Sequence, residues 1–162
     1  LVRPLLEINR SATGEFCREY QLPVWEDVYN LDRKYARVRL RTEIIPQLAA
    51  EFNPQIESHL ARTGELLRAD VECLEFLAED LYGLAIGTAG AKLDRILLQS
   101  TPLALQRRVI RRFLNQALGK MPTFSQIEDT IVLIDAPNRT RTSTFSHGLA
   151  AEVSGKWIVV RE

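Results

Sequence analysis

The sequence predicts a predominantly helical α+β fold, in which a long linking helix leads into a small helical body with short antiparallel strands. Apolar residues recur at three- and four-residue spacing for about thirty residues after Asn53-Pro54, which is the period of one helix face. Near the end of the chain, short apolar runs are separated by Gly-containing turns at 147–148 and 154–155, a pattern typical of antiparallel strands. These patterns divide the chain into residues 1–52, 53–91 and 92–162.

The first segment is predicted to hold two helices joined by a structured loop. Ser11 is the predicted N-cap of a helix through about Tyr20, because its hydroxyl can accept a bond from the first turn. Residues 21–30 follow no period and are expected to form the loop. Asp32 is the predicted N-cap of the second helix, which runs toward a further turn at Pro46. That helix is expected to carry five basic residues: Arg33, Lys34, Arg37, Arg39 and Arg41.

The long helix has the clearest start signal in the chain. Asn53 is a favoured cap residue and Pro54 suits the first helical position. Three glycines, Gly83, Gly87 and Gly90, are predicted to end the helix. Thirty residues span on the order of 45 Å, longer than a small core needs, so we expect this helix to link two bodies. Its acidic flank is expected to face solvent.

The last segment is predicted to combine two helices with short strands. Residues 93–98 (L-D-R-I-L-L) are a candidate strand, and a helix is predicted over 101–118. Wound at 100° per residue, this helix has apolar residues on one side. Arginines gather on the other side: Arg107, Arg108, Arg111 and Arg112. A further helix is predicted over 124–134, followed by strands at 142–146, 149–153 and 157–160.

Net charge is zero, but the charges are unevenly distributed. Residues 51–80 hold eight acidic and two basic residues, whereas residues 92–120 hold seven basic residues and one acidic residue. Separated basic patches on a neutral chain favour local docking of a phosphate backbone over indiscriminate coating. One alternative is that both patches are ordinary solvated helix faces. Another is that the arginines of the later patch pair with the acidic long helix.

The 162 residues lack the common catalytic strings. They contain no G-x-x-x-x-G-K-[ST], no S-G-G-x-D-S and no H-E-x-x-H, so catalysis by this segment alone is not expected. Cys17 and Cys73 lack disulfide or zinc-ligand spacing, which favours a reducing compartment and no metal site. His59 and His147 are expected to be structural.

No apolar run approaches the roughly 18 residues needed to cross a bilayer. We therefore predict a cytoplasmic protein without a membrane partner. The chain begins without Met and within an apolar stretch, which suggests a portion of a longer protein. Residues 1–52 are then expected to expose apolar side chains such as Leu5, Leu6 and Val24.

Residues 25–41 combine acids and an amide in a loop with arginines on the following helix. Charge-assisted hydrogen bonds between them would form an internal clamp that holds the loop rigid. Alternatively, the guanidinium groups remain available for phosphate. Arg37 and Arg41 are i, i+4 neighbours, and like charges at that spacing cost stability unless something neutralises them.

A series of strings in fixed order resembles the tRNA(Ile)-lysidine synthetase family. These are R-P-L-L at 3–6, F-C at 16–17, L-P at 22–23, W-E-D-V-Y-N-L-D-R-K-Y-A-R-V-R-L-R at 25–41, I-P at 45–46 and N-P at 53–54. Further along, L-A-L-Q-R-R-V-I-R-R-F-L and the terminal hairpin resemble the family's substrate-binding domain. The two parts of the resemblance are collinear and span most of the chain.

The resemblance implies a ligase that joins the side-chain amine of lysine to C2 of the wobble cytidine of tRNA(Ile) with a CAU anticodon, forming lysidine. ATP, with Mg²⁺, would adenylate that carbon in the parent protein, and neither is expected to bind this segment alone. Residues 1–52 would end an ATP-pyrophosphatase-type nucleotide-binding domain, residues 53–91 would form the linking helix, and residues 92–162 would bind tRNA. A homodimer is compatible with this reading.

Position by position, seven residues match the family motif that closes the nucleotide-binding domain, and the resemblance places them near the active site: Asp27, Asn30, Asp32, Tyr35, Arg37, Arg39 and Arg41. None is assigned as a catalytic residue. Two positions depart from the family pattern: Tyr29 replaces the usual Ser, and Val38 replaces the Asn of R-N-R. These departures are expected to alter local geometry or weaken activity.

The later arginines are expected to include phosphate contacts that position tRNA. This set is Arg107, Arg108, Arg111 and Arg112. Two other classes remain open. A non-enzymatic helical adaptor would use the same basic faces for acidic protein partners, and a general RNA-binding module would bind RNA without preference for tRNA(Ile).

Overall fold

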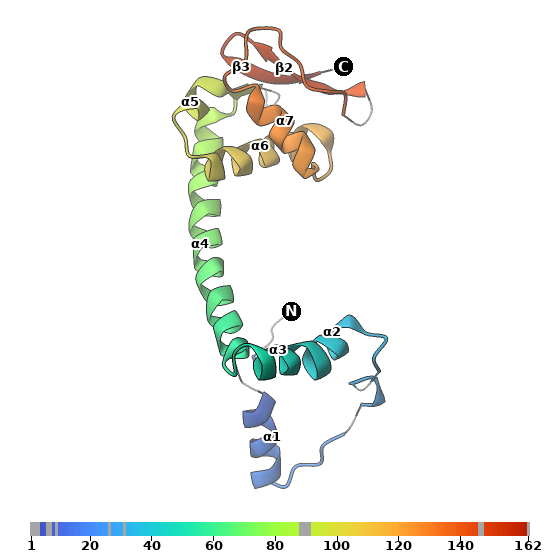
Figure 1. Ribbon diagram of the computed structural model, residues 1–162. Helices are drawn as coiled ribbons and strands as arrows, with labels where there is room; N and C mark the ends of the chain where they lie inside the picture. Colours follow the sequence, from blue (N-terminus) through green and yellow to red (C-terminus); the bar gives the residue numbers. More distant parts are fainter. Residues whose placement is uncertain are drawn as a thin grey trace. The chain divides into compact units, whose positions relative to one another are not determined.

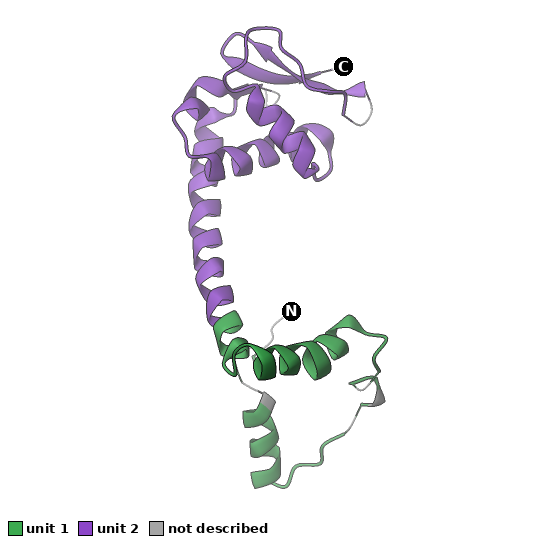
Figure 2. Cartoon of the chain, viewed as in Figure 1, with its two compact units in different colours: residues 1–61 green, residues 62–162 purple. Residues whose placement is uncertain are grey.

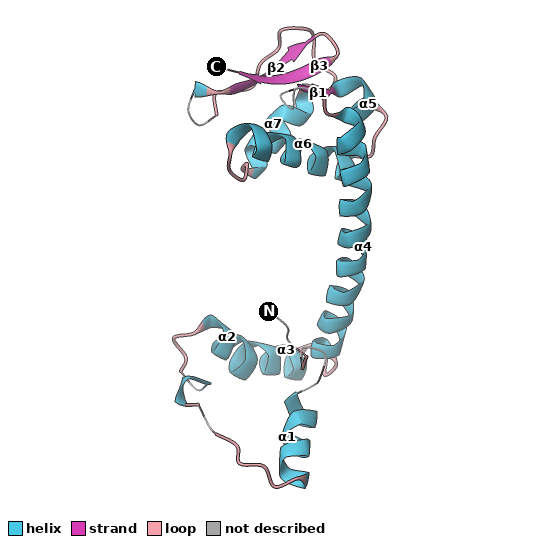
Figure 3. Ribbon diagram, turned by 180° about the vertical axis from the view of Figure 1, so that it is seen from behind, coloured by secondary structure: helices cyan, strands magenta, loops and turns pink. Residues whose placement is uncertain are grey.

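The computed structural model describes residues 4–5, 8, 10–25, 27–30, 32–87, 92–145 and 148–161. The chain divides into two compact units, Leu1–Ala61 and Arg62–Glu162 (Figure 2). Among the described residues, helices occur in both units and the strands all lie in the second (Figure 3). This confirms the predicted α+β, predominantly helical class.

The first unit consists of short helical elements (Figure 1). They are α1 (Arg10–Glu19), the 3₁₀ turn η1 (Val28–Asn30), α2 (Ala36–Arg39), the π-helical turn η2 (Leu40–Ile44) and α3 (Ile45–Glu51). Because α1 already includes Arg10, Ser11 lies inside the helix and its predicted role as N-cap is wrong. The predicted loop after α1 is confirmed for the described residues of 21–30, apart from the single turn η1.

Asp32 does not cap α2. Its Oδ1 accepts a hydrogen bond from the backbone N–H of Lys34 at 3.0 Å, closing a local turn of the kind that Asp side chains favour. The N-cap is Tyr35, which makes no side-chain cap bond. Arg33 and Lys34 therefore lie in the turn, and only the later arginines of the first basic run lie on the helix.

The π-helical turn lies directly before a proline. The N–H of Ile45 donates to the carbonyl of Leu40, five residues back. Pro46, in the first turn of α3, has no N–H with which to continue the ordinary i to i−4 ladder. This agrees with the prediction that a further turn starts at Pro46, although the helical run continues through it.

The long helix is confirmed as α4 (Ile56–Ala85), which has 30 residues. Asn53 accepts a hydrogen bond from the N–H of Gln55 through Oδ1 at 2.8 Å, and its carbonyl accepts one from Ile56 at 3.0 Å. The helix continues through Gly83, so that glycine is not the predicted stop. Its last turns pack into the second unit, where Ala78 and Ala85 are fully buried.

The second unit places helices beside a small antiparallel sheet, which has three strands among the described residues (Figure 1). After α4 follow β1 (Lys92–Asp94), α5 (Arg95–Gln99), α6 (Leu103–Leu118), α7 (Phe124–Val132), β2 (Ala150–Ser154) and β3 (Trp157–Arg161). The strand order is β1-β3-β2, and both pairings are antiparallel. Ile158 of β3 pairs with Leu93 on one side and Val153 on the other.

Two predicted strands differ from the structure. The strand over 93–98 stops at Asp94, because the Asp94 side chain accepts from the N–H of Ile96 at 3.0 Å and starts α5. Residues 142–145 form no strand, although an isolated bridge between Arg141 and Glu152 and a hydrogen bond of 2.9 Å from the N–H of Thr142 to the carbonyl of Ala151 connect this stretch to β2. Residue 146 lies outside the described part.

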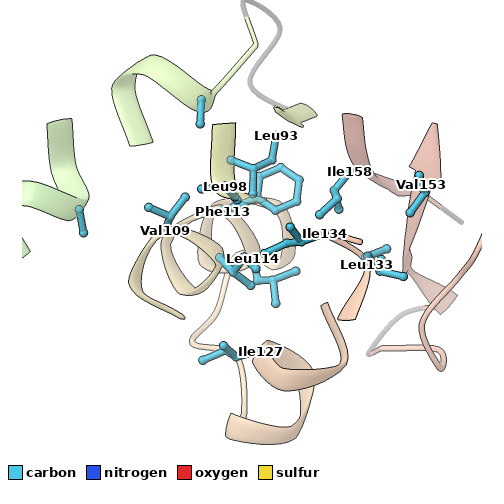
Figure 4. Close-up of a cluster of buried hydrophobic side chains, with 14 of the residues drawn as sticks. Leu93, Leu98, Val109, Phe113, Leu114, Ile127, Leu133, Ile134, Val153 and Ile158 are labelled. Carbon is cyan, nitrogen blue, oxygen red and sulfur yellow. The ribbon is translucent and has the colours of Figure 1, made fainter. Parts of the chain in front are cut away.

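The core of the second unit forms where α6 meets the sheet and α7 (Figure 4). Four residues of α6 have no exposed surface: Val109, Ile110, Phe113 and Leu114. They pack with Leu93, Leu98, Ile134 and Ile158 in one apolar cluster. Burial of this apolar face fixes the rotation of α6 about its axis, so the opposite face of the helix points away from the core.

The first unit leaves apolar side chains uncovered, as expected. Leu5 and Val24 are exposed, and Trp25 is 92% exposed. Leu6 lies outside the described residues. Val38 is the exception, with 2% of its surface exposed. Val38, one of the two positions that depart from the pattern of the similar family, therefore makes a buried apolar contact.

Candidate functional site

The arginine face of α6 comprises Arg107, Arg108, Arg111 and Arg112. All four are partly exposed, from 20% for the Arg108 side chain to 41% for that of Arg107. Four neighbouring cations on one helix face repel one another. Their arrangement therefore depends on which carboxylates lie opposite.

Glu75 of α4 receives three of these arginines. Its carboxylate lies 2.6 Å from Arg111 Nη2, 3.2 Å from Arg112 Nη2 and 3.2 Å from Arg108 Nε. Arg112 also donates to Glu79, one turn further along α4, at 2.7 Å. The prediction that the acidic flank of the long helix faces solvent is thus wrong for Glu75, which is half-buried against α6.

The electrostatics of Glu75 follow from these contacts. Burial opposes ionisation, but hydrogen bonds from Arg112 and Arg111 and the charge of Arg108 outweigh it, so the pKa of Glu75 lies below its usual value. For Arg112, burial also disfavours the charged form, yet the bonds to Glu79 and Glu75 raise its pKa. Each side of the cluster keeps the other ionised.

The cluster is not fully satisfied. Nε of Arg108 and Nε of Arg112 are buried without a hydrogen-bond partner among the described residues. Arg108 Nε lies close enough to Glu75 for an ion pair, but its N–H does not point along a bonding direction. Two guanidinium N–H groups therefore have no acceptor among the described residues. A buried unsatisfied donor carries a free-energy cost.

Arg107 belongs to a neighbouring arrangement with α7. Its Nε and Nη2 donate to the two oxygens of Glu128 at 2.8 and 3.0 Å, and its guanidinium carbon lies 5.6 Å from the ring centre of Phe124. A pocket of about 230 Å³ lies here, lined by Arg107, Arg108, Arg111, Phe124 and Ile127. The whole face balances four arginines against Glu75, Glu79 and Glu128, one net positive charge.

In the first unit, the structure brings part of the predicted motif together. Arg41 donates through Nη2 to the carbonyl of Asn30 at 3.2 Å, and the guanidinium of Arg37 stacks over the Tyr35 ring at 5.3 Å. Asp27 accepts from the N–H of Tyr29 at 3.0 Å and stabilises its own turn. The internal-clamp interpretation therefore has a direct contact at Arg41.

Arg39 has different surroundings. It lines a pocket of about 320 Å³ with Ala36, Leu40, Glu43 and Ile44 at the π-helical turn. Glu43 pairs with Arg33 at 2.6 Å. The hydrogen bond from Arg33 lowers the pKa of Glu43, burial opposes this, and the charge of Arg39 lowers it further. Arg39 therefore borders an open pocket near the carboxylate of Glu43, which Arg33 binds.

Sequence reasoning missed Glu75, Glu128, Phe124 and Glu43 as parts of these arrangements. Glu75 and Glu79 lie four residues apart on the acidic flank, a spacing that places both on one helix face. The available signal for this pairing was the row of four arginines on a later helix, whose charge is opposite to that of the two acids. For Phe124 and Glu43 the sequence offered no comparable pattern.

Of the two histidines, only His59 lies among the described residues. The Nδ1 of His59 lies 3.2 Å from Nδ2 of Asn53 at the start of α4, and His147 lies outside the described residues. Cys17 and Cys73 are free. Among described residues, no three His, Cys, Asp or Glu side chains gather as metal ligands would. In that same part of the chain, no helix is long and apolar enough to cross a bilayer.

Replacing Glu75 tests the link between α4 and α6. We expect Glu75→Gln to destabilise the second unit by about 1–2 kcal/mol at pH 7, since it removes the charge that faces three arginines. The pKa of Glu75 is lowered on folding, so its contribution is present above about pH 4.5 and is lost as pH falls through the folded-state pKa. Thermal unfolding from pH 3 to 7 should therefore show a smaller acid dependence in Glu75→Gln.

Glu72→Gln on the exposed side of α4 is the matched control and should leave both stability and its pH dependence unchanged. Equal unfolding curves for Glu75→Gln and the original chain would show that the three-arginine contact contributes nothing.

Two family matches cover different parts of the chain. The PP-loop domain family matches residues 1–48, which include the loop and arginines of the first unit. The TilS substrate binding domain family matches residues 93–146, which include α6, α7 and the pocket between them. The two matches occur in the same order as the collinear motifs in the sequence.

Curated relatives match almost the whole chain. A tRNA(Ile)-lysidine synthase of Nostoc sp. is 49% identical over 99% of this chain and 51% of its own length. That of Synechocystis sp. is 46% identical over 98% of this chain and 48% of its own length, and the chloroplastic one of Pyropia yezoensis is 34% identical over 99% and 48%. The chain thus spans about half the length of these relatives. With both family matches in order and this identity along its length, the chain belongs to the tRNA(Ile)-lysidine synthase family.

Proposed function

We propose that these residues are part of a cytoplasmic tRNA-modifying ligase that attaches lysine to C2 of the wobble cytidine of tRNA(Ile) with a CAU anticodon, using ATP. The observation that carries the proposal is the arginine face of α6. It lies within the substrate-binding match and opposite the buried side of the helix. A partly exposed row of guanidinium groups suits a phosphate backbone.

In this proposal the two units have different roles. Asp27, Asn30 and Arg41 hold the loop of the first unit in one conformation, which closes the edge of the PP-loop domain. Arg39, beside its pocket, is a candidate for contact with a charged reactant. Three acids of the first unit bind local groups: Asp27 and Asp32 accept from nearby backbone N–H groups, and Glu43 pairs with Arg33. In this proposal ATP and Mg²⁺ bind in the PP-loop domain of the complete protein.

The α6 arginines would hold tRNA by its phosphates. A guanidinium has five N–H donors, and Arg111 uses only Nη2 toward Glu75 among the described contacts. Arg107 and Arg111 keep about two-fifths of their side chains exposed. The carboxylates therefore orient the arginines while leaving donors for an anion, at the cost of a lower net charge.

The two other classes predict different behaviour. A helical adaptor would bind acidic proteins and no folded tRNA, whereas a general RNA-binding module would bind RNA without preference for tRNA(Ile). In the structure, the arginines that an adaptor would use for acidic proteins already pair with acids of the same chain, Glu75 and Glu128. Comparing tRNA(Ile) with another tRNA of equal length separates the ligase proposal from both classes. The proposal also includes a homodimer, which the molecular mass from sedimentation would test.

The first test is the formation of lysidine. A protein with a complete PP-loop domain in front of these residues should convert tRNA(Ile) to the lysidine form with lysine and ATP. The 162-residue chain alone should not, because its sequence contains no S-G-G-x-D-S loop to cradle the phosphates of ATP. Mass spectrometry of digested tRNA measures the product. Lysidine made by the chain alone, or none made by the complete protein, contradicts the proposal.

A charge reversal tests the arginine face. Changing Arg107 and Arg111 to Glu should weaken tRNA binding and reduce the slope of log K against log salt by about one for each lost phosphate contact. The control, Arg62→Glu with Arg68→Glu on α4, makes the same charge change away from α6 and should keep the slope. An equal slope in all three proteins would mean that the α6 arginines serve only Glu75 and Glu128.

The third test separates the two basic patches by role in the complete enzyme. Arg39→Ala or Arg41→Ala should lower kcat more than tRNA affinity, since positioning contacts near the reacting groups act on turnover. Arg111→Ala should lower affinity more than kcat. Equal losses of affinity with normal kcat in all three would make the early arginines ordinary RNA contacts. A lowered melting temperature with normal kinetics for Arg41→Ala would leave it as a structural clamp.

A further inference from the structure

Phe124 is an apolar ring held in an exposed position. It is the first residue of α7, and 68% of its surface is exposed. A capping box fixes this end of the helix, because Gln126 N–H donates to Thr123 Oγ1 at 3.3 Å and Thr123 N–H donates to Gln126 Oε1 at 2.8 Å. The core does not account for this ring, since the buried side of α7 is formed by Ile127 and Thr130.

The arginine beside the ring is fixed as well. Both oxygens of Glu128 hold the guanidinium of Arg107, in the fork geometry that limits rotation of the group. Its guanidinium carbon lies 5.6 Å from the ring centre, within the range of a cation–π contact. Because α7 supplies both Phe124 and Glu128, ring and guanidinium form one rigid wall of the pocket.

The rest of the pocket supplies positive charge. Arg108 and Arg111 complete the lining with Ile127, around a volume of about 230 Å³. Arg111 is 40% exposed, and its Nη2 is the one nitrogen engaged among described contacts. A largely exposed aromatic ring beside guanidinium donors is the combination that binds a nucleobase and its phosphate together.

We propose that this pocket between α6 and α7 takes one unpaired nucleotide of RNA, with its base stacked on Phe124 and its phosphate beside Arg111. The inference rests on the proposed tRNA function and adds a subsite to it. Paired bases in a helix have no free face for a side chain, whereas bases in loops, bulges and ends can stack on an aromatic ring. The pocket would therefore distinguish unpaired from paired RNA, which a row of arginines alone cannot do.

A single RNA change tests the subsite. The 162-residue chain is titrated with a short RNA duplex that carries one unpaired adenosine, and with the same duplex in which that nucleotide has lost its base. Both RNAs have equal charge, so phosphate contacts cancel in the comparison. The original chain should bind the RNA with the base about five to a hundred times more tightly.

Variants of the ring then identify the contact. Phe124→Ala and Phe124→Leu should abolish the preference for the base, whereas Phe124→Tyr should keep it. Met121→Ala, which removes another exposed apolar side chain outside the pocket lining, is the control and should also keep the preference. Arg111→Gln should weaken binding of both RNAs alike. Unchanged melting temperatures confirm that each variant is folded.

Several results would overturn the inference. A preference that survives Phe124→Ala means that the base binds elsewhere, while RNA binding and the proposed function stand. A preference kept by Phe124→Leu means apolar contact without stacking. Displacement of the RNA by micromolar adenosine monophosphate, with the same dependence on Phe124, assigns the pocket to a free nucleotide. A chain that binds neither RNA, yet binds an acidic peptide through Phe124, overturns the tRNA role as well.

Discussion

The second unit depends on the carboxylate of Glu75, where three arginines of α6 meet one acid of α4. Four apolar residues of α6 have no exposed surface, and the arginines on its other side pair with acids of α4 and α7. Without Glu75, only Glu79 and Glu128 of these acids would remain to balance the four arginines. The same constraint fixes the pocket, because Arg108 and Arg111 form part of its lining.

Much of this fold could be predicted from local signals in the sequence. Asn53-Pro54 and the long apolar period predicted α4, and the separation of apolar from basic residues predicted the two faces of α6. Sequence alone did not show that Asp94 ends β1 by capping α5, or that Asp32 closes a turn. An Asp side chain accepts bonds equally well in a cap and in a turn, so the tertiary contacts decide between them.

The arginines of the candidate site could be predicted from the sequence, but the individual acidic residues that pair with them could not. Charge patterning located the arginines, but solvated acids and buried counter-ions look alike in a sequence. Glu72 and Glu75 lie three positions apart on the same acidic stretch, and of these two only Glu75 pairs with arginines of α6. The exposed ring of Phe124 was missed for a related reason, because a single aromatic residue does not by itself form a helical or strand pattern.

We expect Glu75 to restrain the arginines both as a structural partner and as a competitor for phosphate. The most direct measurement is a double-mutant cycle of Glu75→Gln and Arg111→Gln, read out as tRNA affinity at fixed salt with folded protein. Removing the competing carboxylate should tighten tRNA binding, and this gain should shrink once Arg111 is absent, because the two groups are coupled. Weaker binding by Glu75→Gln, or additive effects of the two changes, would contradict the account.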